Sequence, residues 1–195
     1  SHKINKVAAT ISCTNKTYNG TEQTACSCTG GTIGGEYKAT NYRSTDYSAS
    51  CTPDGNHTAP SNKTWKMKQA GLTIDAYEVT WASGTTYTRS NYATGVNNEK
   101  ITLTYTPYTN AASTTAYTYA TTAGSGKYTL ALSSTNYKIT SAGGLTINKA
   151  AATISCSDKT YNGTEQTACS CTGGIIGGEY KATTAGTHTA SCTAD

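Results

Sequence analysis

The sequence predicts an all-β protein: small β-modules in an elongated tandem array, stapled by disulfides. Residues 4–40 return at 147–183, where only four of the 37 aligned positions differ. Short windows alternate between apolar and polar residues with the period of two that strands require. Eight cysteines fall into two sets of four, and small domains with thin cores are commonly held by disulfides. A repeat of this fidelity is typical of stacked structural modules rather than of an active site.

The repeat unit is about 72 residues long, because the two cysteine-rich copies lie 143 residues apart and a diverged copy lies between them. In that middle copy, residues 136–150 resemble residues 64–76. The third copy lacks the closing Leu-Thr-Ile strand, so we expect the chain to end within a longer array. The predicted modules are 3–75 with four cysteines, 76–148 without cysteine, and 149–195 with four cysteines.

The composition predicts modules with thin cores. Leu, Ile, Val and Phe together supply 18 of 195 residues, below the share of an ordinary globular core. The formal charge is only +4, so the high net charge that accompanies disorder is missing. Thr and Tyr supply 41 and 15 residues, and both are favoured on pleated, half-buried surfaces.

The middle module indicates that the cysteines occupy core positions. Leu132 stands at the position of Cys51, and Ile101 and Leu103 can be placed over the two cysteines of the Cys-Ser-Cys motif. Crosslinks in the outer modules therefore replace aliphatic packing in the middle one. Because disulfides persist in oxidising surroundings, we expect an extracellular location.

The pairing of the cysteines depends on one loop. An Asn-Gly dipeptide lies midway between Cys13 and Cys26, and a hairpin closed there would put these two opposite each other and leave Cys28 for Cys51. A wider loop would favour Cys13 with Cys28 and Cys26 with Cys51. The same alternatives apply in the third module to Cys156, Cys169, Cys171 and Cys192.

Several short motifs resemble one known family. Tyr-Asn-Gly occurs at 18–20 and 161–163, an Ala-Gly-Thr-His-Thr-Ala strand at 185–190, Asn-Tyr at 136–137, and Gly-Leu-Thr-Ile-Asn-Lys-Ala at 144–150. This order resembles the mostly-beta-grasp (MBG) repeats of large bacterial surface proteins, although the four-cysteine pattern departs from their usual cysteine-poor repeat. The resemblance implies β-grasp-like modules in a secreted, wall- or envelope-associated stalk or adhesin, with no catalytic residues to carry over.

Catalytic and metal chemistry find little support in the sequence. The Cys-x-Cys motif with lone flanking cysteines lacks the paired spacing of zinc sites. A cysteine–Gln23 thioester is conceivable, but we interpret Gln23 as part of a polar strand edge. His57 and His188 are the only credible bases, and neither accompanies a nucleophile and an orienting group. We therefore expect no enzymatic activity, no cofactor and no metal.

The leading hypothesis is a non-catalytic stalk or spacer of a secreted bacterial cell-surface protein, whose partners are the neighbouring repeats. The alternative is an adhesin segment that binds a glycan or host surface protein through the middle module. Aromatic rings stack on sugars, so the candidate ligand-facing side chains are Trp65, Trp81, Tyr87 and Tyr92; the competing interpretation is that such rings shield the core. Dispersed charge and the lack of a long apolar run predict neither nucleic-acid binding nor membrane insertion.

Overall fold

The computed structural model describes residues 1–194, and strands account for 52% of the structure against 2% helix. The all-β prediction is confirmed. The single helical element among the described residues is a 3-10 turn at Val96–Asn98. The chain divides into two compact units, which are described separately: the first consists of 1–75, 87–105 and 130–143, and the second of 76–86, 106–129 and 144–195.

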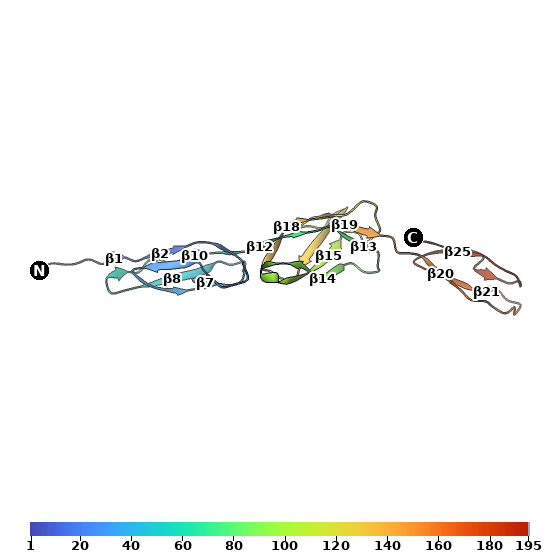
Figure 1. The fold of residues 1–195 in the computed structure, drawn as a ribbon, viewed down its shortest axis with the longest axis horizontal. Helices are drawn as coiled ribbons and strands as arrows, with labels where there is room; N and C mark the ends of the chain where they lie inside the picture. Colours follow the sequence, from blue (N-terminus) through green and yellow to red (C-terminus); the bar gives the residue numbers. More distant parts are fainter. Residues whose placement is uncertain (195) are drawn as a thin grey trace. The chain divides into compact units, whose positions relative to one another are not determined.

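The N-terminal part of the first unit combines antiparallel and parallel pairs. β2 pairs antiparallel with β5, β8 lies between β6 and β10, and β4 pairs with β7. Figure 1 shows β2, β8 and β10 side by side. Two pairs are parallel, β1 with β9 and β3 with β11. The bounds are β1 (Val7–Ala8), β2 (Thr10–Cys13), β3 (Lys16–Thr17), β4 (Gln23–Thr24), β5 (Cys26–Thr29), β6 (Gly31–Gly35), β7 (Lys38–Ala39), β8 (Tyr47–Pro53), β9 (His57–Thr58), β10 (Lys63–Trp65) and β11 (Met67–Lys68).

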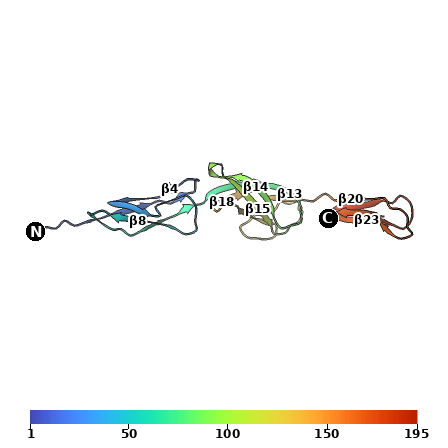
Figure 2. The ribbon, with the colours of Figure 1, turned by 90° about the horizontal axis from the view of Figure 1, so that it is seen from below.

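The remainder of the first unit contains one parallel and one antiparallel pair. β12 (Ala70–Ile74) runs parallel to β18 (Tyr137–Ala142). β14 (Tyr87–Thr94) pairs antiparallel with β15 (Lys100–Pro107), as Figure 2 shows. β12 thus forms its ladder with a strand of the middle module, although the boundary predicted at residues 75 and 76 falls after it.

The second unit repeats the same kinds of pairing. β13 runs parallel to β19, and β16 to the start of β17. β20 pairs antiparallel with β22, β21 with β24, and β23 with β25. Among the described residues, no helix has the length and apolar character needed to cross a membrane. The bounds are β13 (Tyr77–Thr80), β16 (Thr118–Tyr119), β17 (Lys127–Leu132), β19 (Leu145–Asn148), β20 (Thr153–Cys156), β21 (Gln166–Thr167), β22 (Cys169–Thr172), β23 (Gly174–Gly178), β24 (Lys181–Ala182) and β25 (Ala190–Ala194).

The core is thin and rich in rings, as the composition predicts. Strands β12 and β15 bury alternate residues, as the pleat of a strand requires. Ile101 and Leu103 are fully buried, at the positions that align with the Cys-Ser-Cys motif. Tyrosine and tryptophan supply the volume that Phe and Leu supply in other cores. The buried rings are Tyr18, Trp65, Tyr87, Tyr105, Tyr117, Tyr128 and Tyr137.

The disulfides join Cys13 to Cys26 and Cys28 to Cys51, the pairing that a loop closed near Asn19 favours. Cys13 and Cys26 lie directly opposite each other in the β2–β5 ladder. The loop itself differs from a two-residue hairpin, because β3 leaves to pair with β11 and β4 with β7. The third module repeats the arrangement in the bridges Cys156–Cys169 and Cys171–Cys192.

The two cysteine-rich copies differ in burial although their sequences agree. Ile11 is 8% exposed, whereas its equivalent Ile154 is 42% exposed. In the first copy β10 pairs with β8 and β11 with β3. The sequence after Cys192 contains no counterpart of β10 and β11. Ile154 is therefore more exposed than Ile11 because no strands equivalent to β10 and β11 pack beside the third copy, and not because its local sequence differs.

Candidate functional site: a tyrosine–glutamate cluster

Two of the four aromatic candidates are core residues. Trp65 is 1% exposed, stacks on Tyr47 with 4.7 Å between ring centroids, and donates its indole N–H to the Glu36 carbonyl at 2.6 Å. Tyr87 is buried as well. A ring without an exposed face cannot stack on a sugar, so the ligand-facing interpretation of Trp65 and Tyr87 is replaced by the core-shielding one.

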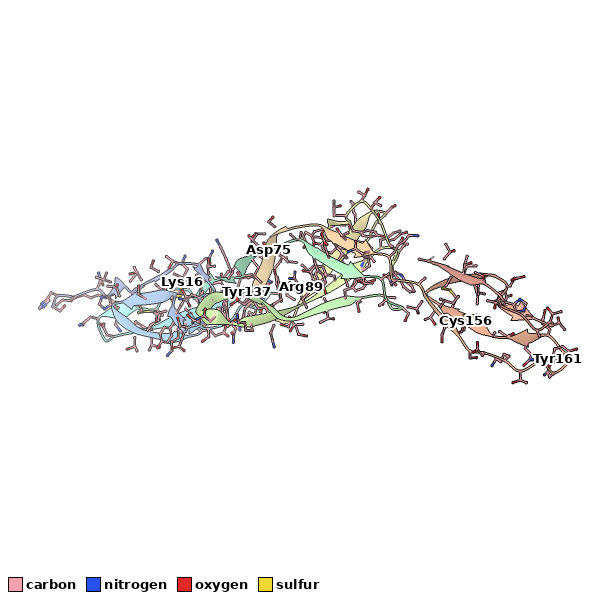
Figure 3. The ribbon with its side chains drawn as sticks, turned by 45° about the vertical axis from the view of Figure 1, so that its right-hand side comes forward. Lys16, Asp75, Arg89, Tyr137, Cys156 and Tyr161 are labelled. Carbon is pink, nitrogen blue, oxygen red and sulfur yellow. A yellow bond between two sulfur atoms is a disulfide. The ribbon has the colours of Figure 1, made fainter. Side chains whose placement is uncertain are left out.

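The other two candidates, Trp81 and Tyr92, are each 39% exposed. The Tyr92 ring covers the Arg89 guanidinium, 3.1 Å from the ring centroid, and its hydroxyl donates to Asp75 at 3.3 Å; Figure 3 labels Arg89 and Asp75. A cation on one face leaves Tyr92 little room to stack on a ligand. Trp81 donates to the Asn110 carbonyl at 3.1 Å. It lines a hollow of about 350 Å³ together with Asn110, Ala111, Ala112, Lys149, Ala150 and Gly173.

A tighter group of polar side chains lies elsewhere in the first unit. The Tyr18 and Tyr137 hydroxyls donate to the two carboxylate oxygens of Glu99, Tyr137 at 2.8 Å. The two rings meet edge to face, with 5.4 Å between centroids and 83° between planes. We call Tyr18, Glu99 and Tyr137 the tyrosine–glutamate cluster. It joins residues that are 81 and 38 positions apart in the sequence.

The loop that carries Glu99 is shaped for this contact. The Gly95 N–H donates to the Glu99 carbonyl at 2.8 Å, and the Val96 N–H donates to the Tyr137 hydroxyl at 2.9 Å. Asn97 adopts a left-handed conformation with φ 52°, which Asn tolerates better than most residues. Its side-chain amide donates to the Asn19 carbonyl at 3.2 Å. The loop 95–99 therefore contacts both the Tyr-Asn-Gly turn and β18.

Gly20 completes the contact by leaving space for Asn97. Its φ is +80°, which glycine adopts at little cost. A Cβ at this position would overlap the Asn97 side-chain amide. The Tyr-Asn-Gly motif thus has three separate roles here: a hydroxyl donor, a carbonyl acceptor and an absent side chain.

A second contact surrounds Asn136, the residue before Tyr137. The Tyr42 N–H donates to its side-chain oxygen at 2.8 Å, and its amide donates to the Asn41 side-chain oxygen at 3.0 Å. Asn41 and Tyr42 fall where the first copy has two residues more than the third. The insertion therefore supplies two hydrogen bonds that the third copy cannot make in this way.

The tyrosine hydroxyls of the cluster are held in their neutral form. Burial, and then the hydrogen bond to Glu99, raise the pKa of Tyr137 to about 12. The hydrogen bond to Glu99, and then burial, also raise the pKa of Tyr18. Burial disfavours the charged phenolate, and a neighbouring carboxylate repels it.

We expect the cluster to lose stability in alkali. The neutral tyrosine is favoured in the folded state, so its contribution is complete below about pH 10 and is lost as the pH rises through about 12. Absorbance of tyrosinate should show that Tyr18 and Tyr137 ionise only above the ordinary pKa of tyrosine. In the Glu99→Gln variant this ionisation should move to lower pH; an unchanged curve would contradict the assignment.

The cluster joins segments that are far apart in the sequence, because Tyr18, Glu99 and Tyr137 meet through two hydroxyl–carboxylate hydrogen bonds. Within residues 1–194, no group of three or more His, Cys, Asp or Glu side chains is placed to hold a metal ion. The cluster binds one part of the chain to another.

The sequence reasoning singled out Tyr18 and Tyr137 as family motifs but missed Glu99 and Asn136 as their partners. The available signals were the two-residue insertion near residue 41 and the Asn-Asn-Glu sequence at 97–99, which follows Gly95 and Val96. No family model matches the chain, and no curated protein or solved structure is significantly similar to it.

Proposed function

We propose that this chain is a non-catalytic structural repeat segment, a stalk or spacer, of a secreted bacterial cell-surface protein of the MBG type. The observation that carries the proposal is the tyrosine–glutamate cluster. Its tyrosines come from the first predicted module and the closing strand of the second, and its carboxylate comes from a loop of the second. Such a contact fixes one module against the next without any catalytic group.

The backbone supports the same proposal. β12 is the last strand of the first predicted module, and it pairs over its length with β18 of the second. A module boundary crossed by a ladder bends less freely than one crossed by a flexible linker. A spacer keeps its two ends a fixed distance apart, so it needs a stiff boundary between neighbouring modules.

The disulfides support a location outside the cell. All eight cysteines are paired, and disulfides persist in oxidising compartments. Small modules with few large apolar residues gain about 2–4 kcal/mol from each bridge. That gain suits a protein that must stay folded far from the cytoplasm.

Small-angle scattering of the full chain tests the spacer proposal. We expect an elongated particle whose profile does not change with protein concentration. The Glu99→Ala variant should broaden the distribution of lengths, because both tyrosine hydroxyls lose their acceptor. A compact particle, or identical profiles for the two proteins, would contradict the proposal.

A matched pair of glycine variants isolates the contact made by the Tyr-Asn-Gly turn. Gly20 and Gly163 have φ values of +80° and +78°, but a Cβ at Gly163 has no heavy atom within 4 Å. Alanine costs about 1–2 kcal/mol at either position through backbone strain. Gly20→Ala should cost about 1–3 kcal/mol more, because the overlap also breaks the Asn97 hydrogen bond. Urea unfolding measures both; equal effects would show that Asn97 does not hold the turn.

The adhesin alternative rests on the half-exposed Trp81 beside its hollow. A glycan array with the full chain tests it, with Trp81→Ala as the binding-deficient variant and Trp65 left intact. Binding that disappears in Trp81→Ala would favour the adhesin function. An array without any signal would favour the spacer.

A further inference from the structure

The third module carries a second copy of the Tyr-Asn-Gly turn. The Thr164 N–H and hydroxyl donate to the Asn162 side chain at 3.0 and 2.8 Å, as Thr21 donates to Asn19 at 3.0 and 2.9 Å in the first copy. Gln166 and Gln23 each donate to a backbone carbonyl six residues earlier, both at 2.7 Å. The second turn is therefore built in the same shape as the first.

The two turns differ in what covers them. Tyr18 is 6% exposed, whereas Tyr161 is 67% exposed. The position of a Cβ on Gly20 is filled by Asn97, and that of Gly163 is open. Figure 3 shows Tyr161 at the tip of the C-terminal strands. The same three chemical features are presented, and nothing in the described chain contacts them as Asn97 contacts the first turn.

The occupant of the first turn indicates what fits the second. It must present a carboxylate to the tyrosine hydroxyl, an amide donor to the Asn carbonyl, and a tight loop that reaches the glycine. The loop 95–99, Gly-Val-Asn-Asn-Glu, meets all three requirements at the first turn. The middle module bears this loop but lacks a Tyr-Asn-Gly sequence, so turn and loop are found on different kinds of module.

We propose that Tyr161, Asn162 and Gly163 form a docking site for a further module of the 76–148 type, which would bind through a loop equivalent to 95–99. The proposal rests on the spacer function, which it deepens by naming the partner of the second turn. On this proposal, the unit that repeats is a pair of modules: one carries the Tyr-Asn-Gly turn, and the other carries the loop equivalent to 95–99. The 143-residue offset between the near-identical copies is the length of such a pair.

Tyrosine acetylation by N-acetylimidazole, read by peptide mass spectrometry, tests the proposal. In the native chain, Tyr161 should react about tenfold or more faster than Tyr18, because exposed groups react without local opening. A longer chain is then prepared in which residues 1–192 are followed by a copy of residues 52–148. In it the reaction of Tyr161 should slow to the rate of Tyr18.

A control extension separates docking from completion of the third module itself. In this chain the appended copy of residues 95–99 is replaced by glycine and serine, and all else is kept. Tyr161 should react faster in the control than in the full extension. Equal protection in both extensions, or protection in neither, would overturn the docking site.

A different result, the reactivity of Tyr18 in the Glu99→Ala variant, tests the spacer proposal itself. If that proposal fails, Glu99→Ala in the native chain would leave Tyr18 as unreactive as before, which would show that Glu99 does not hold the first turn. Exposure of Tyr18 by Glu99→Ala, together with a Tyr161 that stays reactive in the full extension, would overturn the second site alone.

Discussion

Replacement of Trp65 by alanine is expected to lower the free energy of unfolding of the first unit by about 3–5 kcal/mol. Trp65 is the largest fully buried side chain, and it stacks on Tyr47 and satisfies the Glu36 carbonyl. In a core with few Leu, Ile and Val residues, few flexible apolar side chains can move into the cavity that the missing indole leaves. We expect this single change to remove much of the stability of a module that is marginal for its size.

Urea unfolding followed by far-ultraviolet circular dichroism measures the effect, with Trp81→Ala as the matched control. Trp81 is the chain's other tryptophan and is 39% exposed, so its loss should cost less than about 1 kcal/mol. A variant with Trp81→Phe leaves Trp65 as the sole tryptophan, whose emission can be excited selectively at wavelengths that tyrosine does not absorb. Its emission should be that of a buried indole and should shift on unfolding. Similar losses for the two alanine variants would contradict the assignment of Trp65 to the core.

The second large effect is expected from removing one disulfide of the first copy. Cys28 and Cys51 are 23 positions apart, and closing a loop of that length stabilises a fold by about 3 kcal/mol in the chain-entropy view. The double variant Cys28→Ala with Cys51→Ala should lose about that much. Because Cys51 is buried and its alanine leaves a small cavity, the loss should exceed that of the equivalent pair Cys171 and Cys192.

Thermal unfolding with and without reductant measures this loss, and intact mass supplies the control. Reduction should add eight hydrogens to the native chain and six to the double variant, which keeps three bridges, whereas a thioester would instead show the loss of ammonia. An unchanged melting temperature in the double variant would contradict a structural role for the bridge. A mass that does not change on reduction would contradict the pairing itself.

The sequence was sufficient for those parts of the fold that depend on local periodicity. Alternation placed Ile101 and Leu103 inside, and the position of the Asn-Gly dipeptide favoured Cys13 opposite Cys26 while a second pairing stayed open. The actual loop is wider, because β3 and β4 pair with strands that lie up to 51 residues away. Pairings over such distances are set by the whole module, and no window of sequence reveals them.

The tyrosine–glutamate cluster could not be predicted for the same reason. Tyr18 and Tyr137 stood out as motif residues, but their common partner Glu99 lies in a loop without a periodic pattern. The left-handed conformation of Asn97 is indicated only by the general tolerance of Asn for that region, which does not say what the loop contacts. Ring exposure was equally hidden: a tryptophan on a strand faces the core or the solvent according to its register, and Trp65 and Trp81 differ in this respect.

The insertion near residue 41 makes the two copies unequal in the hydrogen bonds that they offer to a neighbouring module. The first copy forms two hydrogen bonds with the Asn136 side chain, one from the Tyr42 backbone N–H and one to the Asn41 side-chain oxygen. The third copy has neither residue at the equivalent position. In the proposed spacer, a junction made by the first kind of copy would have two hydrogen bonds that a junction made by the other kind lacks. We expect that, under tension, the junction without them opens first.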